Sequence, residues 1–570
     1  MEPKMLTHEI ARYYILDQQA VVNPELFAVV NGFNRSRNLE GLATCSSLFC
    51  QALHTMEDWR FLRQVEAFFK KNALFADETK CFEAAKATFE ENEVLCQLTN
   101  IRLRKAYLDP DLYLSKDIDL CLQINLMRRF IRNVLGDFHE FINALPALVK
   151  VTPGATAQSS RRNSLPQQKL GLKPYVTFGA RKYVALLFRW FGFERFAIKH
   201  CESNRIECVP KNWKTNRSIA CEPEGNIPLQ LAVDTWVKRK LKLQGIDLSD
   251  QSRNQRLAKH ASIYNDFVTV DFSSASDTIS IETVRWLLPP LWFKYLDNVR
   301  SPFFRGVFGT GKYAKFSSMG NGATFVLESL IFGAMCHALG SRKFLVYGDD
   351  VIIEERFFSR FCGLAKFLGF SVNQEKTFSC GPFRESCGGD YFLGNDVTPV
   401  YIRNIDSRKA SLCHLVNSLG AITHQWSELA KYLSEIVKDY SLPYVPYNEN
   451  TMSGIWIDPV VARRLKLLVR RAVRKGGPVL DHYRAYCPLA ERRVFVDSRG
   501  YYLWFLRKNS QVLFAGPWGS SNVSQSLTIT SSVPVFRHRY VRKWVVWFPP
   551  NDGTSDLINW SELISRNNSR

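Results

Sequence analysis

The chain has 570 residues, with 75 Lys and Arg against 54 Asp and Glu, which gives a formal net charge of +21. Apolar residues make up 46% and charged residues 23%, which excludes a disordered chain and predicts a globular protein with a large core. The positive charge favours a polyanionic partner, either nucleic acid or an anionic membrane, although a solvated basic surface has the same composition.

Membrane insertion is not expected, because no run of roughly 18 uninterrupted apolar residues occurs. The first residues lack the charged and then apolar pattern of a signal peptide. The 14 cysteines are scattered without a CxxC pair, so we expect free thiols in a reducing cytoplasm and no zinc knuckle.

The first 140 residues predict helices, because apolar residues recur at helical spacing, as in Leu62, Val65, Phe68 and Phe69. The polar segment 152–168 that follows is rich in Pro, Gly and Ser, and it predicts a linker or a finger-like loop.

The next segment, 206–228, is dense in basic and aromatic residues. It contains Lys211, Trp213, Lys214 and Arg217, and a generic basic surface loop is one interpretation of this composition. A helix with a basic end at 238–242 is expected after it.

Strands and helices alternate from Phe267 to Arg403. The apolar run Phe267–Val270 predicts a buried strand that leads directly into Asp271, where a lone carboxylate is costly without a partner. Asp277 is expected to be the N-cap of a helix that begins near Thr278, a role compatible with a substrate contact.

A Gly-rich turn, Ser317–Thr324, precedes the helical run Phe325–Met335. Such a turn at the start of a helix lets a backbone or a nucleotide approach closely.

Two apolar runs, Phe344–Tyr347 and Val351–Ile353, flank Gly348 and two adjacent carboxylates, Asp349 and Asp350. This pattern predicts a β-hairpin with a type II′ turn, since glycine accepts the positive φ that the turn requires. A polar turn often carries an Asp pair, but two carboxylates fixed between buried strands repel each other unless a cation lies between them.

Asp271, Asp349 and Asp350 at the ends of adjacent strands suit two-metal phosphoryl transfer with Mg²⁺. Such a site binds two ions roughly 3.5–4 Å apart, which stabilise the attacking and the leaving oxygen.

Beyond this region, 463–475 predicts an amphipathic helix with Arg463, Lys466, Arg470 and Arg474 on one face. Its seven cations and lack of acidic residues make a contact with phosphates at least as plausible as a solvated face. The last 70 residues predict strands without obvious chemistry.

Taken in order, the carboxylate strand, the Gly-rich loop with its helix and the Gly-Asp-Asp hairpin resemble motifs A, B and C of viral RNA-dependent RNA polymerases. The sequence is most similar to the replicase catalytic (beta) subunit of small positive-strand RNA bacteriophages, the levivirus-like family, from about Ile206 to about Arg403. The segments that carry the resemblance are Val209–Asn212, Gly245–Leu248, Asp271–Asp277, Ser318–Gly322, Tyr347–Asp350 and Phe383–Gly388.

The resemblance implies a role for each matching residue. Asp271, Asp349 and Asp350 match the catalytic, metal-binding carboxylates, and Lys376 matches a lysine proposed to protonate pyrophosphate, although a solvent-exposed lysine is the alternative at that position. The implied nucleotide-binding residues are Lys211, Lys214, Arg217, Asp277, Ser318, Gly320 and Asn321.

Asp277 matches the position that senses the ribose of the incoming nucleotide. Its expected partner in the motif B helix is Asn in many polymerases of this class, but Glu328 stands there in this chain. Two carboxylates hydrogen-bond each other only if one is protonated or a cation bridges them.

The resemblance implies an α+β fold: a right-hand polymerase with helical fingers, an antiparallel-sheet palm and a thumb. We expect an N-terminal and fingers region at 1–205, fingers with the basic element at 206–265, a palm at 266–405, and a thumb with the C-terminal region at 406–570.

The implied activity is replication of a positive-strand phage RNA genome: template-directed NTP addition by two-metal nucleotidyl transfer, with pyrophosphate release and de novo initiation. The implied cofactors are two Mg²⁺ ions, for which Mn²⁺ can substitute. The implied partners are single-stranded RNA, NTPs, host elongation factors Tu and Ts and a small-subunit ribosomal protein, in the cytoplasm of an infected bacterium and without a membrane.

Two rival interpretations remain at this point. A reverse transcriptase shares the carboxylate palm but often places a bulky aromatic residue near the position of Asp277, and it would prefer dNTPs. A non-catalytic RNA-binding coat or packaging protein is consistent with the charge alone.

Overall fold

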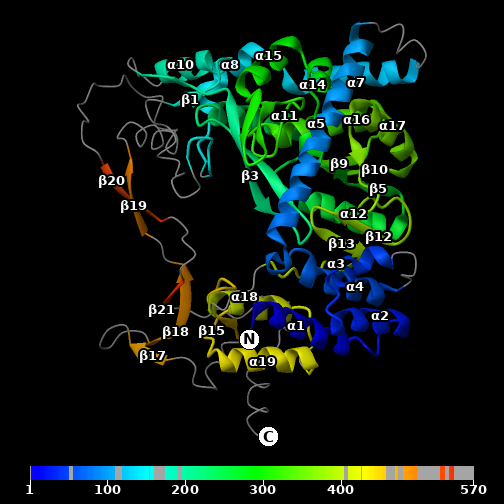
Figure 1. Cartoon of the computed structure of the whole chain (residues 1–570), viewed down its shortest axis with the longest axis vertical. Helices are drawn as coiled ribbons and strands as arrows, with labels where there is room; N and C mark the ends of the chain where they lie inside the picture. The colour runs from blue at the N-terminus through cyan, green and yellow to red at the C-terminus, as the bar shows by residue number, and fades with distance from the viewer. Residues whose placement is uncertain are drawn as a thin grey trace.

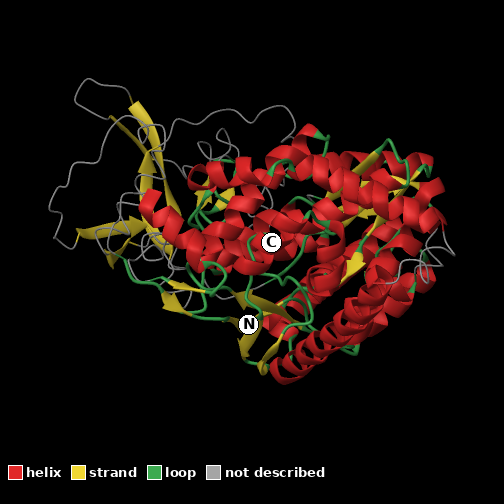
Figure 2. Ribbon diagram, turned by 90° about the horizontal axis from the view of Figure 1, so that it is seen from above, coloured by secondary structure: helices red, strands yellow, loops and turns green. Residues whose placement is uncertain are grey.

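The structure is a computed structural model, and it describes residues 2–49, 55–108, 118–152, 154–159, 174–190, 196–403, 409–424, 426–447 and 449–457. Beyond these residues it describes the backbone of five strands between Val469 and Trp544. In the view from above, helices make up most of the larger part of the molecule and short strands lie among them (Figure 2).

The N-terminal region is helical, as its apolar spacing predicts. Leu62, Val65, Phe68 and Phe69 are fully buried on one helix, α4, whose first turn is capped by the hydroxyl of Thr55. The helices are α1 (Pro3–Asp17), α2 (Pro24–Arg35), α3 (Leu39–Leu48), α4 (Met56–Lys70), η2 (Ala73–Phe75), α5 (Glu78–Leu108), α7 (Ile118–Leu135) and α8 (Phe138–Leu148).

A four-stranded sheet lies beside the long helix α5, with the strand order β4-β3-β7-β8 (Figure 1). Its strands are β3 (Ser203–Pro210), β4 (Asn216–Cys221), β7 (Phe303–Gly306) and β8 (Gly309–Lys312). The neighbouring elements are β1 (Tyr175–Val176), α10 (Arg181–Trp190), β2 (Lys199–His200), α11 (Asn226–Leu243), which carries the expected basic end, and α12 (Ser252–Tyr264).

A three-stranded antiparallel sheet, in the order β5-β10-β9, positions the carboxylates. It consists of β5 (Phe267–Val270), β9 (Phe344–Tyr347) and β10 (Asp350–Glu354). Helix α16 (Thr324–Ala338) belongs to the same hydrophobic core and is buried on almost every side. The other elements of this part are β6 (Phe272–Ser273), α13 (Ala275–Thr278), α14 (Ile281–Leu287), α15 (Pro290–Val299), η4 (Glu355–Phe357), α17 (Phe358–Leu368) and β11 (Ser371–Val372).

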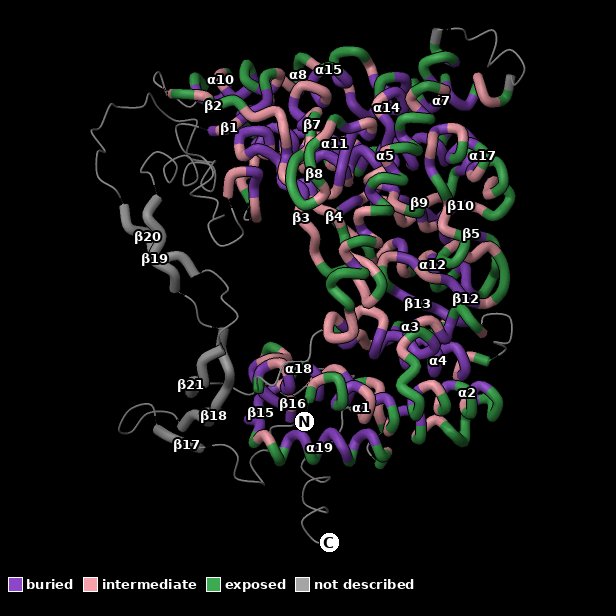
Figure 3. The backbone as a smooth tube through the Cα atoms, in the orientation of Figure 1, coloured by how far each residue is buried: buried purple, intermediate pink, exposed green. Residues whose placement is uncertain are grey.

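A second hydrophobic core joins segments that lie far apart in the sequence. It packs α1–α4 against a hairpin of β12 (Phe383–Ser386) and β13 (Gly389–Phe392), and against α18 (Lys409–Gly420) and α19 (Glu428–Asp439). Figure 3 shows buried and exposed residues alternating along α19, whose buried side faces this core. Three short strands complete the region: β14 (Asn395–Asp396), β15 (Tyr444–Val445) and β16 (Ile455–Trp456).

The C-terminal elements correct one prediction. The helix expected at 463–475 is wrong in its described part, because Val469–Ala472 forms strand β17, which pairs antiparallel with β18. Backbone pairing between strands outweighs a helical spacing of charges where β-branched residues such as Val469 favour extended structure. The remaining strands are β18 (Val479–Pro488), β19 (Glu491–Val496), β20 (Leu527–Ser532) and β21 (His538–Trp544), the last two within the region expected to form strands.

Two further predictions concern loops and membranes. The described residues of 152–168 contain neither helix nor strand, as expected for a loop, and the rest of that segment lies outside the described residues. None of the helices in the described ranges is both long and apolar enough to cross a lipid bilayer.

Candidate active site

Three carboxylates lie at one end of the β5-β10-β9 sheet. The ladder pairs Val270 with Val351, so Asp271 and Asp350, one residue further along each strand, lie at the same end of neighbouring strands. Asp349 occupies the two-residue turn between β9 and β10. Antiparallel pairing therefore brings together side chains that are separated by almost 80 positions in the sequence.

The turn has the geometry that the sequence predicts. Gly348 has a φ of 65°, while Asp349 is absent from the residues with positive φ, as in a type II′ turn. A Cβ atom at Gly348 would lie 2.7 Å from the ring of Phe325, so any larger residue would displace the turn from α16. The backbone amide of Gly348 also donates to Ser329 Oγ at 3.0 Å, which fixes the hairpin tip on that helix.

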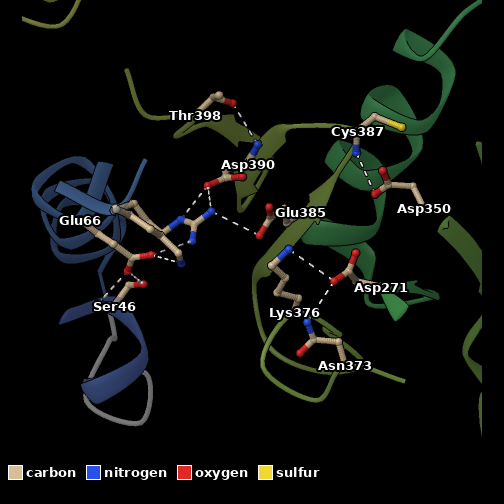
Figure 4. A network of polar contacts seen from close by, with 12 residues as sticks. Ser46, Glu66, Asp271, Asp350, Asn373, Lys376, Glu385, Cys387, Asp390 and Thr398 are labelled. Carbon is tan, nitrogen blue, oxygen red and sulfur yellow. Dashed lines mark hydrogen bonds and ion pairs between the residues drawn. The ribbon is translucent and has the colours of Figure 1, made fainter. Parts of the chain in front are cut away.

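Asp271 contacts two side chains of the loop after β11 (Figure 4). Asn373 donates to Asp271 Oδ2 at 3.1 Å, and Lys376 Nζ lies 3.4 Å from the same oxygen. Burial raises the pKa of Asp271, the Lys376 charge lowers it, and the Asp349 charge raises it again. The net shift of the pKa of Asp271 is upward, which means that its surroundings favour the neutral form of this carboxyl group over the charged one.

Asp350 points toward the β12–β13 turn, where Cys387 N donates to its Oδ1 at 3.0 Å and Ser386 Oγ lies 3.3 Å away. Burial raises the pKa of Asp350 to about 6; the amide of Cys387 opposes this, whereas the charges of Asp349 and Asp271 add to it. The three aspartates therefore repel one another electrostatically.

This donor set fits a divalent cation by its chemistry. Carboxylate oxygens are the ligands that Mg²⁺ prefers, and a cation between them would relieve the mutual repulsion that adds to the effect of burial in raising the pKa values of Asp271 and Asp350. Within the described chain, no three Asp, Glu, His or Cys side chains are close enough to form a ready-made metal site. Lys376, whose side chain is 49% exposed, provides the positive charge beside Asp271 instead.

Lys376 is exposed, as the alternative interpretation of the sequence expected, and it nevertheless lies beside the carboxylates. Partial burial lowers its pKa, but the charges of Asp271 and Glu385 outweigh this effect and raise the pKa above its ordinary value. Lys376 is thus a protonated donor at the site, which is the state that a general acid needs. Glu385 lies in the segment Phe383–Gly388 that carries the family resemblance, but the sequence analysis assigned it no role at the site.

The three predicted cations of the basic element divide into two groups. Lys211 and Arg217 flank the β3–β4 connection, and the pKa of Lys211 is lowered by partial desolvation and by the charges of Arg217 and Lys376, while Asp271 and Asp349 oppose the shift. Lys211 therefore lies within the electrostatic field of the aspartates. Lys214 instead lies 3.7 Å from Glu40 of α3 and over the ring of Trp213.

The predicted Gly-rich loop is fixed by backbone contacts. Gly320 has a φ of 109°, and a Cβ atom there would lie 2.3 Å from the carbonyl oxygen of Ala220 in β4, so glycine is required. Ser318 O accepts from the hydroxyl of Thr324 at 2.9 Å, and Asn321 Oδ1 accepts from Ala323 N at 2.9 Å. These contacts hold the loop between β4 and the start of α16.

Asp277 corrects a prediction, because it is not an N-cap. It lies within the four-residue helix α13, and Ser280 caps α14 by accepting from Thr283 N at 3.2 Å. The short helix ends before α14 begins, so the carboxylate is free of the backbone and pairs with Lys315 at 2.8 Å. Lys315 was missed by the sequence analysis; its only signal was a lysine inside the otherwise apolar run 313–316.

Glu328 is buried on α16, and its Oε1 has no hydrogen-bond partner in the part of the chain that the structure describes. Burial raises the pKa of Glu328 to about 8; the charges of Asp349 and Asp277 contribute, and a hydrogen bond with Ser276 opposes the shift. This shift favours the protonated form of Glu328, which would relieve the conflict between two ionised carboxylates.

Comparison with known proteins assigns the family. The family model described as "RNA replicase, beta-chain" matches residues 14–442, three quarters of the chain, so this chain belongs to the RNA replicase beta-chain family. The match includes every candidate site residue described above.

Similar curated proteins include the RNA-directed RNA polymerase subunit beta of Qbeta virus (strain MX1), 40% identical over 59% of this chain and 57% of that protein. The corresponding subunit of Escherichia virus Qbeta is 37% identical over 65% of this chain and 66% of its own length. The matches thus span about three fifths of these relatives. Among solved structures, the BmCPV RNA-dependent RNA polymerase at its elongation state gives a TM-score of 0.36 at 11% identity, covering 64% of this chain and 35% of that one, a likeness too low to support a functional conclusion.

Proposed function

We propose that this chain is an RNA-directed RNA polymerase that replicates a positive-strand phage RNA from NTPs by two-metal nucleotidyl transfer. The observation that carries the proposal is the convergence of Asp271, Asp349 and Asp350 at one sheet end, with Lys211 within their electrostatic field. Membership of the replicase beta-chain family supports the same activity.

Each residue would contribute to the transfer in its own way. Asp271, Asp349 and Asp350 would hold two Mg²⁺ ions, or Mn²⁺ in their place, which supply charge neutralisation at the attacking 3′-oxygen and the departing pyrophosphate. Lys211 and Arg217 would bind the triphosphate, because cations beside the phosphates stabilise the leaving group. Lys376 would donate a proton to the pyrophosphate oxygen as it leaves.

The nucleotide would lie against the Gly-rich loop. Ser318, Gly320 and Asn321 would contact it where the φ of Gly320 allows close backbone approach, and Asp277 would accept a hydrogen bond from its ribose. Lys214 belongs to the same proposed element, although its pairing with Glu40 makes a direct phosphate contact secondary.

In this proposal the chain has the right-hand arrangement of fingers, palm and thumb. The palm is 266–405 with the antiparallel sheet, the fingers are 206–265 together with the N-terminal region 1–205, and the thumb begins at 406. Synthesis would begin de novo in the cytoplasm of the infected bacterium. The name "subunit beta" of the relatives supports a complex with further subunits, for which the family resemblance suggests elongation factors Tu and Ts and a small-subunit ribosomal protein.

The test is incorporation of radiolabelled NTPs on an RNA template by the purified full-length chain, with and without bacterial extract. We expect Asp349→Asn to abolish incorporation while RNA affinity is kept, and Asp439→Asn, at an exposed position on α19, to change neither.

Three outcomes distinguish the rival functions. Preference for dNTPs over NTPs would identify a reverse transcriptase. RNA binding without any synthesis, with extract present, would leave a packaging protein. Undiminished synthesis by Asp349→Asn would remove the proposed metal site.

A further inference from the structure

Lys315 is a buried lysine that contacts two carboxylates from different elements. Its side chain is 1% exposed, and its Nζ lies 2.8 Å from Asp277 Oδ1 and 3.6 Å from Glu93 Oε1. A buried ammonium is costly unless it is paired, so the fold depends on this contact, whereas it depends little on an exposed ion pair.

Aromatic rings enclose the rest of the Lys315 ammonium. Its Nζ lies 4.3 Å from the ring centroid of Phe89 and 5.1 Å from that of Tyr313, distances at which the ring faces attract a cation. The rings therefore hold the ammonium of Lys315 in one position, and in that position Asp277 is its closest ionic partner.

The backbone that carries Lys315 is fixed on both sides. On one side, Ala314 N donates to Glu93 Oε2 at 2.6 Å, and Asn100 of α5 donates to Ala314 O at 2.7 Å. On the other side, Phe316 N donates to Ile279 O at 2.7 Å, and Ile279 follows α13 directly. Lys315 and Asp277 are thus held by neighbouring, hydrogen-bonded segments and cannot separate without breaking them.

The two carboxylates are not equivalent partners. Glu93 already accepts a hydrogen bond from Ala314 N and lies farther from the ammonium, whereas Asp277 is closer and belongs to α13, which begins four residues after Asp271. If Lys315 served only to neutralise Glu93, its closest contact would not be with a residue of the site.

We propose that Lys315 is the positioning residue that makes the site select ribose over deoxyribose, by fixing the carboxylate of Asp277 toward the 2′-hydroxyl of the incoming nucleotide. This inference rests on the proposed function. A site built to hydrogen-bond a substrate hydroxyl rejects the analogue that lacks it, provided that the acceptor is held in place. A freely rotating Asp277 would lose that discrimination and keep the chemistry.

The experiment compares single-nucleotide incorporation of GTP and dGTP by the full-length chain, as kcat/KM for each. We expect Lys315→Met, which keeps the length and removes the charge, to reduce the preference for GTP about 10-fold to 100-fold, with dGTP incorporation changed less than about 3-fold. Lys315→Arg keeps the charge, so it should retain more of the preference than Lys315→Met does. Lys312→Met, at an exposed lysine on the neighbouring strand β8, is the matched control and should leave the ratio unchanged.

Loss of folding is addressed by a second variant. Lys315→Met with Glu93→Gln removes one charge of each sign and keeps Asp277, so thermal unfolding of this double variant should lie closer to that of the original chain than that of Lys315→Met. The double variant should show the same reduced preference for GTP.

Each remaining outcome counts against one proposal and not both. No incorporation of any nucleotide by the unaltered chain, even with bacterial extract, would refute the polymerase itself. An active chain whose Lys315→Met variant keeps its GTP preference, or loses GTP and dGTP incorporation equally, would overturn the inference alone. Failure of both variants to fold would also overturn it, because Lys315 would then be required for folding and not for choosing the sugar.

Discussion

Two groups of carboxylates lie on either side of Glu385, and they differ in how their charge is compensated (Figure 4). In one group, buried Arg63 of α4 donates to Asp390 Oδ2 at 2.7 Å, lies 3.3 Å from Glu385 and 3.9 Å from Glu66. Glu66 is further bound by Lys70 and by the hydroxyl of Ser46. This group connects α4 to the β12–β13 hairpin with nearly every charge paired.

In the other group, Asp271, Asp349 and Asp350 have Lys376 as the one cation at ion-pair distance among the described residues. The comparison teaches that the protein compensates its buried charges where they hold elements together. It leaves negative charge in excess at the aspartates that are proposed to bind Mg²⁺. Removing a charge should therefore be costly in the first group and harmless to folding in the second.

The largest expected effect is on the excess-charge group. Asp271→Asn should lower NTP incorporation roughly 1,000-fold or more, because a metal-binding carboxylate is lost. The same change should not lower the thermal unfolding temperature, since burial already disfavours the charged form of Asp271 and raises its pKa. Calorimetry and incorporation on the same preparation would test this, and a marked loss of stability would mean that the two groups do not differ as described.

The paired group should respond in the opposite way. Arg63→Met should destabilise the chain by about 3–5 kcal/mol, because it leaves Asp390 buried without its cation, whereas Glu66 keeps Lys70. Arg12→Met removes an exposed pair with Glu9 and should cost about 0–1 kcal/mol. Urea unfolding measures both, and equal effects would contradict the comparison.

Glu328 should avoid adding a further negative charge by staying protonated, and this should make the stability of the chain depend on pH. Its pKa is about 8 in the folded chain against 4.5 as the ordinary value, so the unfolded chain loses this proton first and the contribution of Glu328 to stability falls as the pH rises from 4.5 to 8. Glu328→Gln carries no titrating proton, so its advantage over the unaltered chain should grow through that window to about 5 kcal/mol and level off above pH 8. Urea unfolding at pH 5 and pH 8 with EDTA would show it; a pH-independent difference would mean that Glu328 is ionised throughout.

The smallest expected effect is on the KM for NTPs, and it should differ between Lys211 and Lys214. Lys211→Met should raise the KM for NTPs about 10-fold, because Lys211 lies in the field of Asp271 and Asp349. Lys214→Met should raise it about 2-fold or less, since Lys214 pairs with exposed Glu40. Steady-state kinetics at fixed template would distinguish them, and a larger effect at Lys214 would place the triphosphate elsewhere.

The sequence was informative where chemistry follows from local pattern. The N-terminal helices, the strand before Asp271 and the turn at Gly348 are set by residues close together in the chain, so spacing predicted them. It could not locate the partners of Asp277 or Lys376, because Lys315 and Glu385 reach them only through tertiary packing. The helix predicted at 463–475 was wrong for the same reason, because the pairing of Val469–Ala472 with β18 is not encoded in the spacing of the charges in this segment.

One face of helix α5 fixes the segments around Asp277 in position. Its 31 residues extend for about 46 Å, and one row of its side chains contacts the segments around Asp277. Glu93 and Asn100 bind Ala314, Cys96 Sγ lies 3.5 Å from Asp277 O, and Arg104 lies 3.0 Å from Glu282.

These positions are three or four residues apart, so they share one face of the helix. A single inserted residue upstream of Glu93 would rotate that face by about 100°, so that Leu95 takes the place of Cys96 and Leu103 that of Arg104. Insertions of seven residues would nearly restore the phase, but they would move these side chains about 10 Å along the helix axis, so a change in the length of α5 upstream of Glu93 should break the contacts in either case.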